Sequence, residues 1–415
     1  MKFLRVRTAE DLRPLTTRAD PGTELREDVV VIFEKSHITI PFEYPGWFFQ
    51  GLKNCYFLGA TSPKKKVLLD GYPFFLTDCD GIHVADIAMR LDRPFEPHAT
   101  YEKWWNSPKV LTTDPDKPSR NIAFHRCSMS GNTDEIDCGP DNHSMWPAAA
   151  PTAIDGLEFY QCVVGPSFRG FMSGRGKHNF GIAATHVVNA NIQECLFVGH
   201  NRRCPQIKGE AIIRDCLING AGTMAVGLYG GSTVDVINTV HVPSLTTATK
   251  WVIDTAAAKR RVPVVSVVTG TPWREPIELF VSGVHECFTT RKHGSTNLSD
   301  AQQAWAPRSN EDAVINVEPV NLQLMGEPNF ASMSGYVPVV DPWQTLERAG
   351  VQDQLDVECA EAVRAGTMPW IYNYGDAGRM SLPLGDYVGF AANYVLPSGN
   401  DQAILNELLC LNVRP

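Results

Sequence analysis

Four segments of the chain share one pattern of hydrophobic and polar positions. Each alternates apolar and polar residues, reaches a cysteine, and continues with mostly apolar residues. The segments are residues 121–130, 156–165, 190–198 and 210–219, and their cysteines are Cys127, Cys162, Cys195 and Cys216. Alternation with a period of two is typical of strands, because successive side chains of a strand point to opposite faces. We therefore predict a short β-strand in each segment.

The spacing of these segments indicates how the strands are arranged. The four cysteines are 35, 33 and 21 residues apart, and similar strand patterns occur at residues 54–58, 233–237 and 276–280. Short strands at such intervals, without helices between them, are typical of coils that stack on one another. We predict an all-β fold, a single right-handed parallel β-helix, with the four cysteines stacked as a ladder in its core.

Two other interpretations of this pattern stay open. The cysteines could bind a metal, but none forms the Cys-x-x-Cys pair of common zinc sites, which favours a stacked core. The strands could instead form an antiparallel sandwich, which needs tight hairpin turns at short intervals. The Asn-Gly and Asp-Gly pairs that favour such turns are few in this chain.

Helical periodicity is confined to residues 341–367, where apolar residues recur at helical spacing. We predict one or two short helices there, packed on an end or flank of the β-helix. The chain then divides into a β-helix domain, residues 1–340, and a C-terminal helical and extended tail, residues 341–415.

The composition limits the classes of partner. With 43% hydrophobic and 20% charged residues among 415, the chain has the composition of a soluble globular protein. Its net charge of -9 argues against a nucleic-acid partner. No apolar run approaches a membrane span, so we expect no membrane partner. No signal peptide is visible, and we expect an extracellular protein whose leader was removed or a virion-associated one.

Positive charge is concentrated in one stretch despite the negative total. Between residues 169 and 208, six cations face a single acid, which gives a local charge of +5. The cations are Arg169, Arg175, Lys177, Arg202, Arg203 and Lys208, and His178, His186 and His200 lie among them. Adjacent coils could bring these residues to one face, either as a solvated basic surface or as a groove for an anionic chain.

An acidic cluster, Asp134, Glu135 and Asp137, precedes the basic stretch. Carboxylates beside cations indicate either an ion-pair network or a divalent metal such as calcium. These groups suit β-elimination from a uronic-acid polymer, in which cations or calcium neutralise the sugar carboxylate while a base removes the adjacent proton. Hydrolysis, the alternative, needs two carboxylates, which Asp134 and Asp137 could supply.

Several motifs occur in the order found in one enzyme family. They are an opening strand at residues 29–41, the turn Gly59-Ala60-Thr61-Ser62-Pro63, the block His125–Ser130 with Thr133-Asp134-Glu135, the segment Lys177–Gly181, the motif Arg203-Cys204-Pro205-Gln206-Ile207-Lys208, and a helical tail at residues 345–367. On these motifs the chain resembles the pectate lyases of polysaccharide lyase family 1, particularly the pectate trisaccharide-lyase branch, over nearly its whole length. The resemblance implies a parallel β-helix that cleaves a pectate-like glycan with the help of calcium.

The resemblance also implies roles for individual residues. Arg203 holds the place of the base that takes the C5 proton, and Lys208 holds that of a second, substrate-binding cation. Arg169 stands where family members have a substrate-binding lysine. We expect substrate contacts from four further residues of the basic stretch and calcium binding by the acidic cluster. The four are Lys177, His178, His200 and Arg202, and the cluster is Asp134, Glu135 and Asp137.

The chain departs from the family pattern at the calcium site. One expected acid aligns with Lys109, and another aligns with Cys138 unless the alignment slips by one residue to Asp137. The family's Asp-His pair is here His125-Arg126. Two functions follow: a lyase that cleaves a uronic-acid glycan, and a carbohydrate-binding structural protein such as a phage tailspike. Either has an acidic polysaccharide as its partner and is a monomer or a homotrimer.

Overall fold

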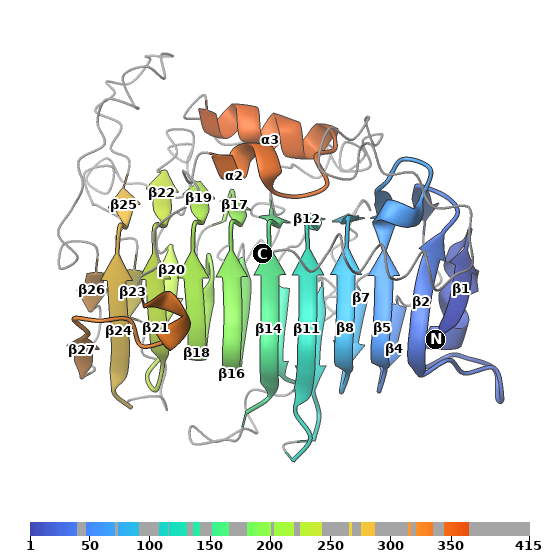
Figure 1. The fold of residues 1–415 in the computed structure, drawn as a ribbon, viewed down its shortest axis with the longest axis horizontal. Helices are drawn as coiled ribbons and strands as arrows, with labels where there is room; N and C mark the ends of the chain where they lie inside the picture. Colours follow the sequence, from blue (N-terminus) through green and yellow to red (C-terminus); the bar gives the residue numbers. More distant parts are fainter. Residues whose placement is uncertain are drawn as a thin grey trace, which may run out of the picture.

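The fold is seen in a computed structural model of the chain. The structure describes residues 1–39, 47–70, 74–90, 108–114, 116–130, 136–141, 152–165, 181–200, 203–219, 225–242, 265–267, 275–286, 314–316, 321–334 and 344–364. These residues form one sheet of 18 strands and one of nine, with a few short helices (Figure 1).

The larger sheet consists of two tracks of strands. The first track pairs, in order, β1 (Lys2–Val6), β2 (Glu27–Phe33), β5 (Lys53–Leu58), β8 (Asp80–Ala85), β11 (Ser119–His125), β14 (Ile154–Tyr160), β16 (Ile182–Gln193), β18 (Gln206–Arg214), β21 (Thr233–Ile237), β24 (Ile277–Ser282) and β27 (Leu322–Leu324). The second track pairs β4 (Trp47–Gln50), β7 (Phe74–Thr77), β10 (Lys109–Thr112), β13 (Ile136–Pro140), the first halves of β16 and β18, β20 (Val226–Leu228), β23 (Val265–Val267) and β26 (Val314–Asn316).

The nine-stranded sheet contains the shortest strands. It pairs β3 (His37–Thr39), β6 (Val67–Asp70), β9 (Ile87–Arg90), β12 (Ser128–Ser130), β15 (Val163–Val164), β17 (Leu196–Val198), β19 (Leu217–Asn219), β22 (Val240–Val242) and β25 (His285–Glu286). The helical elements are η1 (Ala9–Leu15), η2 (Gly59–Thr61), η6 (Ala331–Met333), α2 (Thr345–Arg348) and α3 (Gln354–Arg364).

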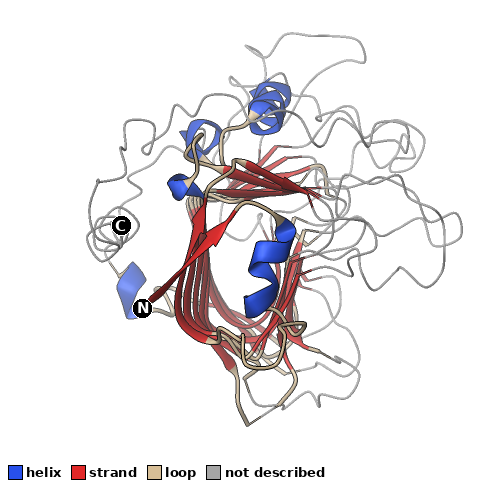
Figure 2. Cartoon of the chain, turned by 90° about the vertical axis from the view of Figure 1, so that its right-hand side faces the viewer, coloured by secondary structure: helices blue, strands red, loops and turns tan. Residues whose placement is uncertain are grey.

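All strand pairings within the described ranges are parallel, as the strand spacing in the sequence predicts. The antiparallel sandwich is therefore wrong for these residues. Seen end-on, the strands of both sheets flank a common interior, and η1 lies across its N-terminal end (Figure 2). Ala9, Leu12 and Leu15 of η1 are buried in the same apolar core as the strands.

The predicted cysteine ladder is present in this core. Cys127, Cys162, Cys195 and Cys216 are fully buried, and each thiol donates to a carbonyl oxygen of the preceding strand layer at 3.2–3.5 Å. Each follows a residue with positive φ, between 48° and 55°, at the corner between the first track and the nine-stranded sheet; these residues are Arg126, Gln161, Glu194 and Asp215. The tight corner turns the chain, and the small thiol fits behind it.

The upstream extension of the cysteine pattern is only partly right. A strand does form there, β5, but Cys55 lies within the strand, with Val29 and Ile82 as its cross-strand neighbours. It therefore occupies a different position from the four ladder cysteines, which follow their strands. Alternation alone identified the strand but could not place the cysteine relative to the corner.

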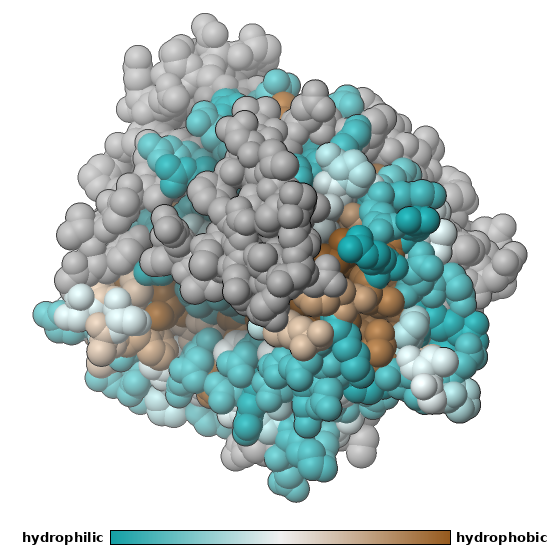
Figure 3. Space-filling view, turned by 45° about the vertical axis from the view of Figure 1, so that its right-hand side comes forward, coloured by the Kyte–Doolittle hydropathy of each residue, from teal (hydrophilic) through white to brown (hydrophobic). Residues whose placement is uncertain are grey.

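The helices predicted at residues 341–367 are confirmed as α2 and α3. They pack on the nine-stranded sheet (Figure 1), and the proposed tail beyond residue 364 lies outside the described residues. Seen from the side of Figure 3, hydrophilic residues cover much of the described surface, and hydrophobic residues gather between them. Over all the described residues, the exposed large apolar side chains are Met1, Leu324 and Val357. Among the described helices, none has the length and apolar character needed to cross a bilayer.

Candidate functional site

The outward side of the second track carries a row of mixed side chains. The strand register places Phe75, Lys109, Asp137, Ala183 and Gln206 beside one another on β7, β10, β13, β16 and β18. The residues that follow them in the chain point into the core; they are Leu76, Val110, Cys138, Ala184 and Ile207. Because neighbouring strands lie about 4.8 Å apart, the row extends for roughly 20 Å across the sheet. We call this outward surface of β7, β10, β13, β16 and β18 the second-track face.

A lysine and an aspartate meet in the middle of the second-track face. Lys109 Nζ lies 3.9 Å from Asp137 Oδ2 and 5.5 Å from the centre of the Phe75 ring. Only 14% and 12% of the two charged side chains are exposed. The ammonium therefore balances the carboxylate and contacts the aromatic ring at once, with less screening by water than an exposed pair has.

The structure shows how Asp137 and Cys138, the two residues at the ambiguous acidic position, are oriented. On β13, Asp137 points outward, whereas Cys138 points into the core and is fully buried. Burial raises the pKa of the Cys138 thiol well above its ordinary value, so the thiol stays protonated. Cys138 is therefore unsuited to bind calcium, and Asp137 is the acid at this place on the sheet.

Arg203 lies in the turn that leads into β18, where three motif segments meet. The Ile182 amide donates to the Arg203 carbonyl oxygen at 2.7 Å, and the Ile136 amide donates to the Gly181 carbonyl oxygen at 2.8 Å. Ile136 directly follows the first part of the acidic cluster, and Gly181 ends the Lys177–Gly181 segment. Segments that are far apart in the sequence are thus hydrogen-bonded side by side.

The backbone at Gly181 packs closely against the backbone at Arg203, which explains why residue 181 is a glycine. A Cβ atom on Gly181 would lie 2.2 Å from the Arg203 carbonyl oxygen, which no side chain tolerates. Arg203 itself has a φ of 66°, a left-handed conformation that is uncommon for residues other than glycine. Other described residues, among them Arg126 and Asp215, have the same conformation at corners of the fold, so it identifies Arg203 as a turn residue.

Lys208 lies on the same outward side of β18, two residues after Gln206. It is paired with Thr185 of β16 and is buried. Burial lowers the pKa of the Lys208 ammonium to about 8, although the nearby charge of Glu275 acts in the opposite direction. A lysine with this pKa loses its charge just above neutral pH, so its binding of anions depends on pH in that range.

His200 is placed differently from the basic residues. It follows β17 of the nine-stranded sheet and is buried, with its Nε2 atom 2.9 Å from the Val164 carbonyl oxygen. Burial lowers the pKa of His200 to about 4, so the ring is neutral at ordinary pH. This placement gives His200 a contact with the interior backbone and no exposed surface for a sugar.

The His125-Arg126 pair lies on the first track rather than on the second-track face. His125 Nε2 is 3.2 Å from Glu158 Oε2 of β14, and Arg126 forms a two-pronged ion pair with Asp86 at 2.7 and 3.0 Å. Asp86 and Arg126 both have positive φ at successive corners. The pair therefore links neighbouring corners of the sheet, a contact that holds the fold together.

The structure brings together part of the predicted site. Arg203 and Lys208 border β16 and β18, and Asp137 is two strands away from β18 on the same face. Six predicted site residues lie outside the described residues: Asp134, Glu135, Arg169, Lys177, His178 and Arg202.

Two residues of the second-track face, Lys109 and Gln206, were not predicted from the sequence to belong to the site. Lys109 appeared only as the mismatch to an expected acid, and Gln206 only as a spacer within the Arg203 motif. The alternation of apolar and polar residues could have predicted that both residues face outward, because each is next to a core residue, Val110 or Ile207. Phe75 gave no signal beyond that of an ordinary apolar strand residue.

Two of the three acids expected to bind calcium lie outside the described residues. Within the part of the chain that the structure describes, no three His, Cys, Asp or Glu side chains are grouped to hold a metal ion. The described acid of the cluster, Asp137, has the ammonium of Lys109 beside it instead. The fit of calcium therefore depends on Asp134 and Glu135, which lie outside the described residues.

The comparisons with known proteins find no relative of the chain. No protein-family model matches the chain, and the search of curated proteins finds no match.

Proposed function

We propose that this protein is a lyase that cleaves a uronic-acid glycan by β-elimination at the second-track face, with Arg203 as the base. One observation carries the proposal: the chain following Asp134-Glu135, the glycine that ends the Lys177–Gly181 segment, and Arg203 are hydrogen-bonded side by side. These are the segments on which the resemblance to polysaccharide lyase family 1 depends. They belong to successive coils of the parallel stack, so the stack places them next to one another in space.

The fold that we propose is a single right-handed parallel β-helix. The first track, the second track and the nine-stranded sheet are three stacks of parallel strands, which supports this fold. Residues of positive φ form corners between the first track and the nine-stranded sheet, as expected for successive coils. The stacked cysteines support it further, because a ladder of identical residues needs equivalent positions in successive coils.

In the proposed reaction, cations or calcium held by the acidic cluster neutralise the sugar carboxylate. A base removes the proton from C5 of the uronate, the C4–O bond breaks, a C4=C5 double bond forms, and the departing oxygen takes a proton. Charge grows on the uronate carboxylate as C5 loses its proton, so nearby cations stabilise the transition state. Lys208 supplies such a cation below its pKa, and Arg169, Lys177 and Arg202 are proposed to add others.

Arg203 can act as the base only in an altered protonation state. A free guanidinium has a pKa above 12 and holds its proton at neutral pH. The family role that we carry over therefore requires the proton of Arg203 to pass to another group before catalysis. Arg203 lies in the turn before β18, and its side chain is half-buried, which reduces its contact with water.

Incubation with a panel of uronic-acid polymers tests the lyase function. We expect unsaturated sugar ends to accumulate, seen as rising ultraviolet absorbance. Loss of activity with the chelator EDTA and recovery with calcium would establish a metal site at Asp134, Glu135 and Asp137, whereas an unchanged rate would assign the neutralising charge to the cations. No product from any polymer, with or without calcium, would overturn the lyase proposal.

The alternative function is carbohydrate binding without cleavage, as in a phage tailspike or another virion part. The observation that favours it is the Lys109–Asp137 pair, in which a lysine ammonium accompanies the acid where the family pattern expects a second acid. Binding of a uronic-acid polymer without product would support this function. The proposed locations are extracellular or on a virion, and sedimentation would separate the proposed monomer from the homotrimer.

Binding of the uronic-acid polymer should weaken as pH rises through the pKa of Lys208, which is about 8. The ammonium form is present below this pH and is lost above it, whereas the sugar carboxylates stay ionised throughout. We expect affinity at pH 9 to be several-fold lower than at pH 7, measured by calorimetry. The Lys208→Arg variant should remove this decrease, since a guanidinium stays charged. A decrease of the same size in the variant would contradict the assignment.

A further inference from the structure

Helices α2 and α3 lie on the outer face of the nine-stranded sheet (Figure 1). The contact is apolar over most of its area, with residues from strands β15, β17, β19 and β22 facing residues of both helices. The strand residues are Val163, Leu196, Val198, Leu217 and Val240, and the helix residues include Leu346, Leu355, Cys359 and Val363. This segment, residues 344–364, is called the helical clasp below.

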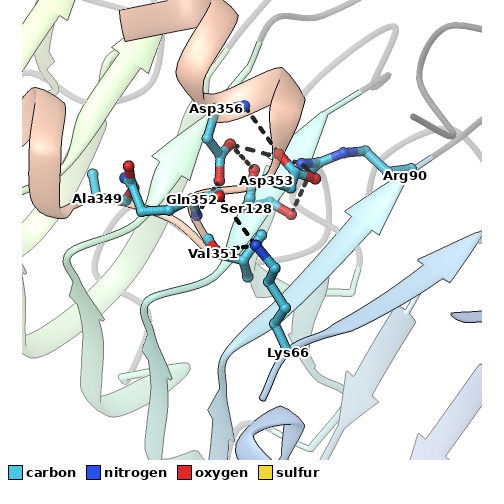
Figure 4. A network of polar contacts seen from close by, with 8 residues as sticks. All are labelled: Lys66, Arg90, Ser128, Ala349, Val351, Gln352, Asp353 and Asp356. Atoms are coloured by element: carbon cyan, nitrogen blue, oxygen red, sulfur yellow. Dashed lines mark hydrogen bonds and ion pairs between the residues drawn. The ribbon is translucent and has the colours of Figure 1, made fainter. Parts of the chain in front are cut away.

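One end of the clasp is held by charges rather than by apolar contacts (Figure 4). Arg90 at the end of β9 donates to Asp353 Oδ2 at 2.8 Å, and its guanidinium is also 3.7 Å from Asp356 Oδ1. Lys66, which precedes β6, donates to the carbonyl oxygens of Val351 and Gln352 at 3.2 and 3.1 Å. All four ionisable side chains are buried, with at most 2% of any of them exposed.

Asp356 is the centre of this cluster, and it is enclosed from every side. The Ser128 hydroxyl of β12 donates to its Oδ1 at 2.5 Å, and the Gln352 amide donates to its Oδ2 at 3.0 Å. On its own helix, the Cys359 thiol is one turn away and is held protonated by burial, which raises its pKa. Glu358, on the same helix, is bonded to Gln354. A Cβ atom on Gly350 would meet Asp356 Oδ2 at 2.4 Å.

Asp353 has a second, local role that keeps it beside Asp356. It precedes α3, and its Oδ1 accepts the Asp356 amide at 3.0 Å, as the side chain of a helix N-cap does. The two carboxyl groups are therefore held close together by the start of the helix, and Arg90 contacts both. Two ionised carboxylates in one dry site repel each other, so the site favours one proton on the pair.

We propose that this cluster makes the helical clasp pH-dependent, so that the clasp is held tightly when Asp356 is protonated and loosens when Asp356 ionises. The proposal concerns the tail and the nine-stranded sheet, and it does not depend on the lyase function. It requires only that the clasp can open while the strands of the core stay paired.

The direction of the effect follows from the pKa of Asp356. Burial first, and then the charge of Asp353, raise this pKa from its ordinary 3.8 to about 7, against the opposing effects of Arg90, Ser128 and Lys66. A raised carboxyl pKa stabilises the docked state fully below about pH 3.8. That stabilisation is lost as the pH rises to about 7, and the docking equilibrium weakens by roughly tenfold per pH unit within this window.

Hydrogen exchange of the α3 amides tests the proposal on the full-length chain. Between pH 5 and pH 7.5, after correction for intrinsic exchange, we expect protection of residues 355–363 to fall by roughly 50- to 100-fold. Protection of the β14 and β16 amides should fall much less, because these strands do not open with the clasp. Equal protection of α3 at both pH values would overturn the proposal, as would a fall of the same size in the strands.

A matched pair of variants separates Asp356 from other titrating groups. Asp356→Asn has the shape of the protonated acid at every pH, so we expect its α3 protection to be the same at pH 5 and pH 7.5. Glu361→Gln removes an exposed carboxylate from the same helix and should keep the wild-type fall. If Asp356→Asn fails to fold, Asp353→Asn takes its place: without the Asp353 charge the pKa of Asp356 is lower, so the fall in α3 protection between pH 5 and pH 7.5 should shrink. A wild-type fall that persists in Asp356→Asn would assign the effect to another group.

Discussion

Replacing Arg203 by alanine is expected to lower the rate of glycan cleavage by about 10²- to 10⁴-fold, the range that a positioned proton-transfer group contributes. The loss should appear in kcat more than in KM, because the base acts on the C5 proton in the transition state. Lys208 and the other cations would still bind the substrate. Steady-state kinetics on the best polymer of the panel, with unfolding midpoints as a check on folding, measures both.

Arg120 provides a matched control for Arg203. It is an exposed arginine of β11, on the first track, so Arg120→Ala removes the same charge away from the second-track face. We expect Arg120→Ala to keep the wild-type rate within about twofold. Unchanged cleavage in Arg203→Ala would exclude Arg203 as the base. A rise in KM with unchanged kcat would show that Arg203 only binds the substrate.

Replacing Gly209 by alanine is expected to destabilise the protein by roughly 2–5 kcal/mol. Gly209 has a φ of 123°, and a Cβ atom there would lie 2.0 Å from the Val187 carbonyl oxygen of β16. Strand β16 is long and paired on both sides, so its backbone cannot move away without breaking hydrogen bonds. Urea unfolding followed by circular dichroism measures the loss as a lower midpoint.

Gly22 separates backbone strain from the steric clash at Gly209. Its φ of 84° is also positive, but a Cβ atom there would meet nothing within 4 Å. Gly22→Ala should therefore cost only the conformational term, about 1–2 kcal/mol. Similar losses in the two variants would mean that β16 relaxes around the new methyl group. Because Gly209 adjoins Lys208, glycan affinity should also fall in Gly209→Ala but not in Gly22→Ala.

Much of the fold could be predicted because its core repeats along the chain. The segments around Cys127, Cys162, Cys195 and Cys216 follow one pattern, because each coil has a small buried residue at the same position after its strand. Cys55 shows the limit of this reasoning. It shares the local alternation, but its place relative to the corner depends on which strands pair, and local pattern does not encode that.

The candidate site was predictable only in part, because its residues come from different strands. The Arg203 motif was recognised as a local sequence, and so was the acidic cluster. That Asp137 faces outward while Cys138 faces inward follows from the register of β13 against β10 and β16. Lys109 was noticed only as a mismatch, yet it stands directly beside Asp137.

The sequence by itself determined the parallel strands, the cysteine ladder and the helical region, because each depends on periodicity. The tertiary structure decided which charges meet. It paired Lys109 with Asp137 and buried Arg90 with Asp353 and Asp356, residues far apart in the chain. The physical reason is that the charge and pKa of a side chain depend on burial and on neighbours from other strands.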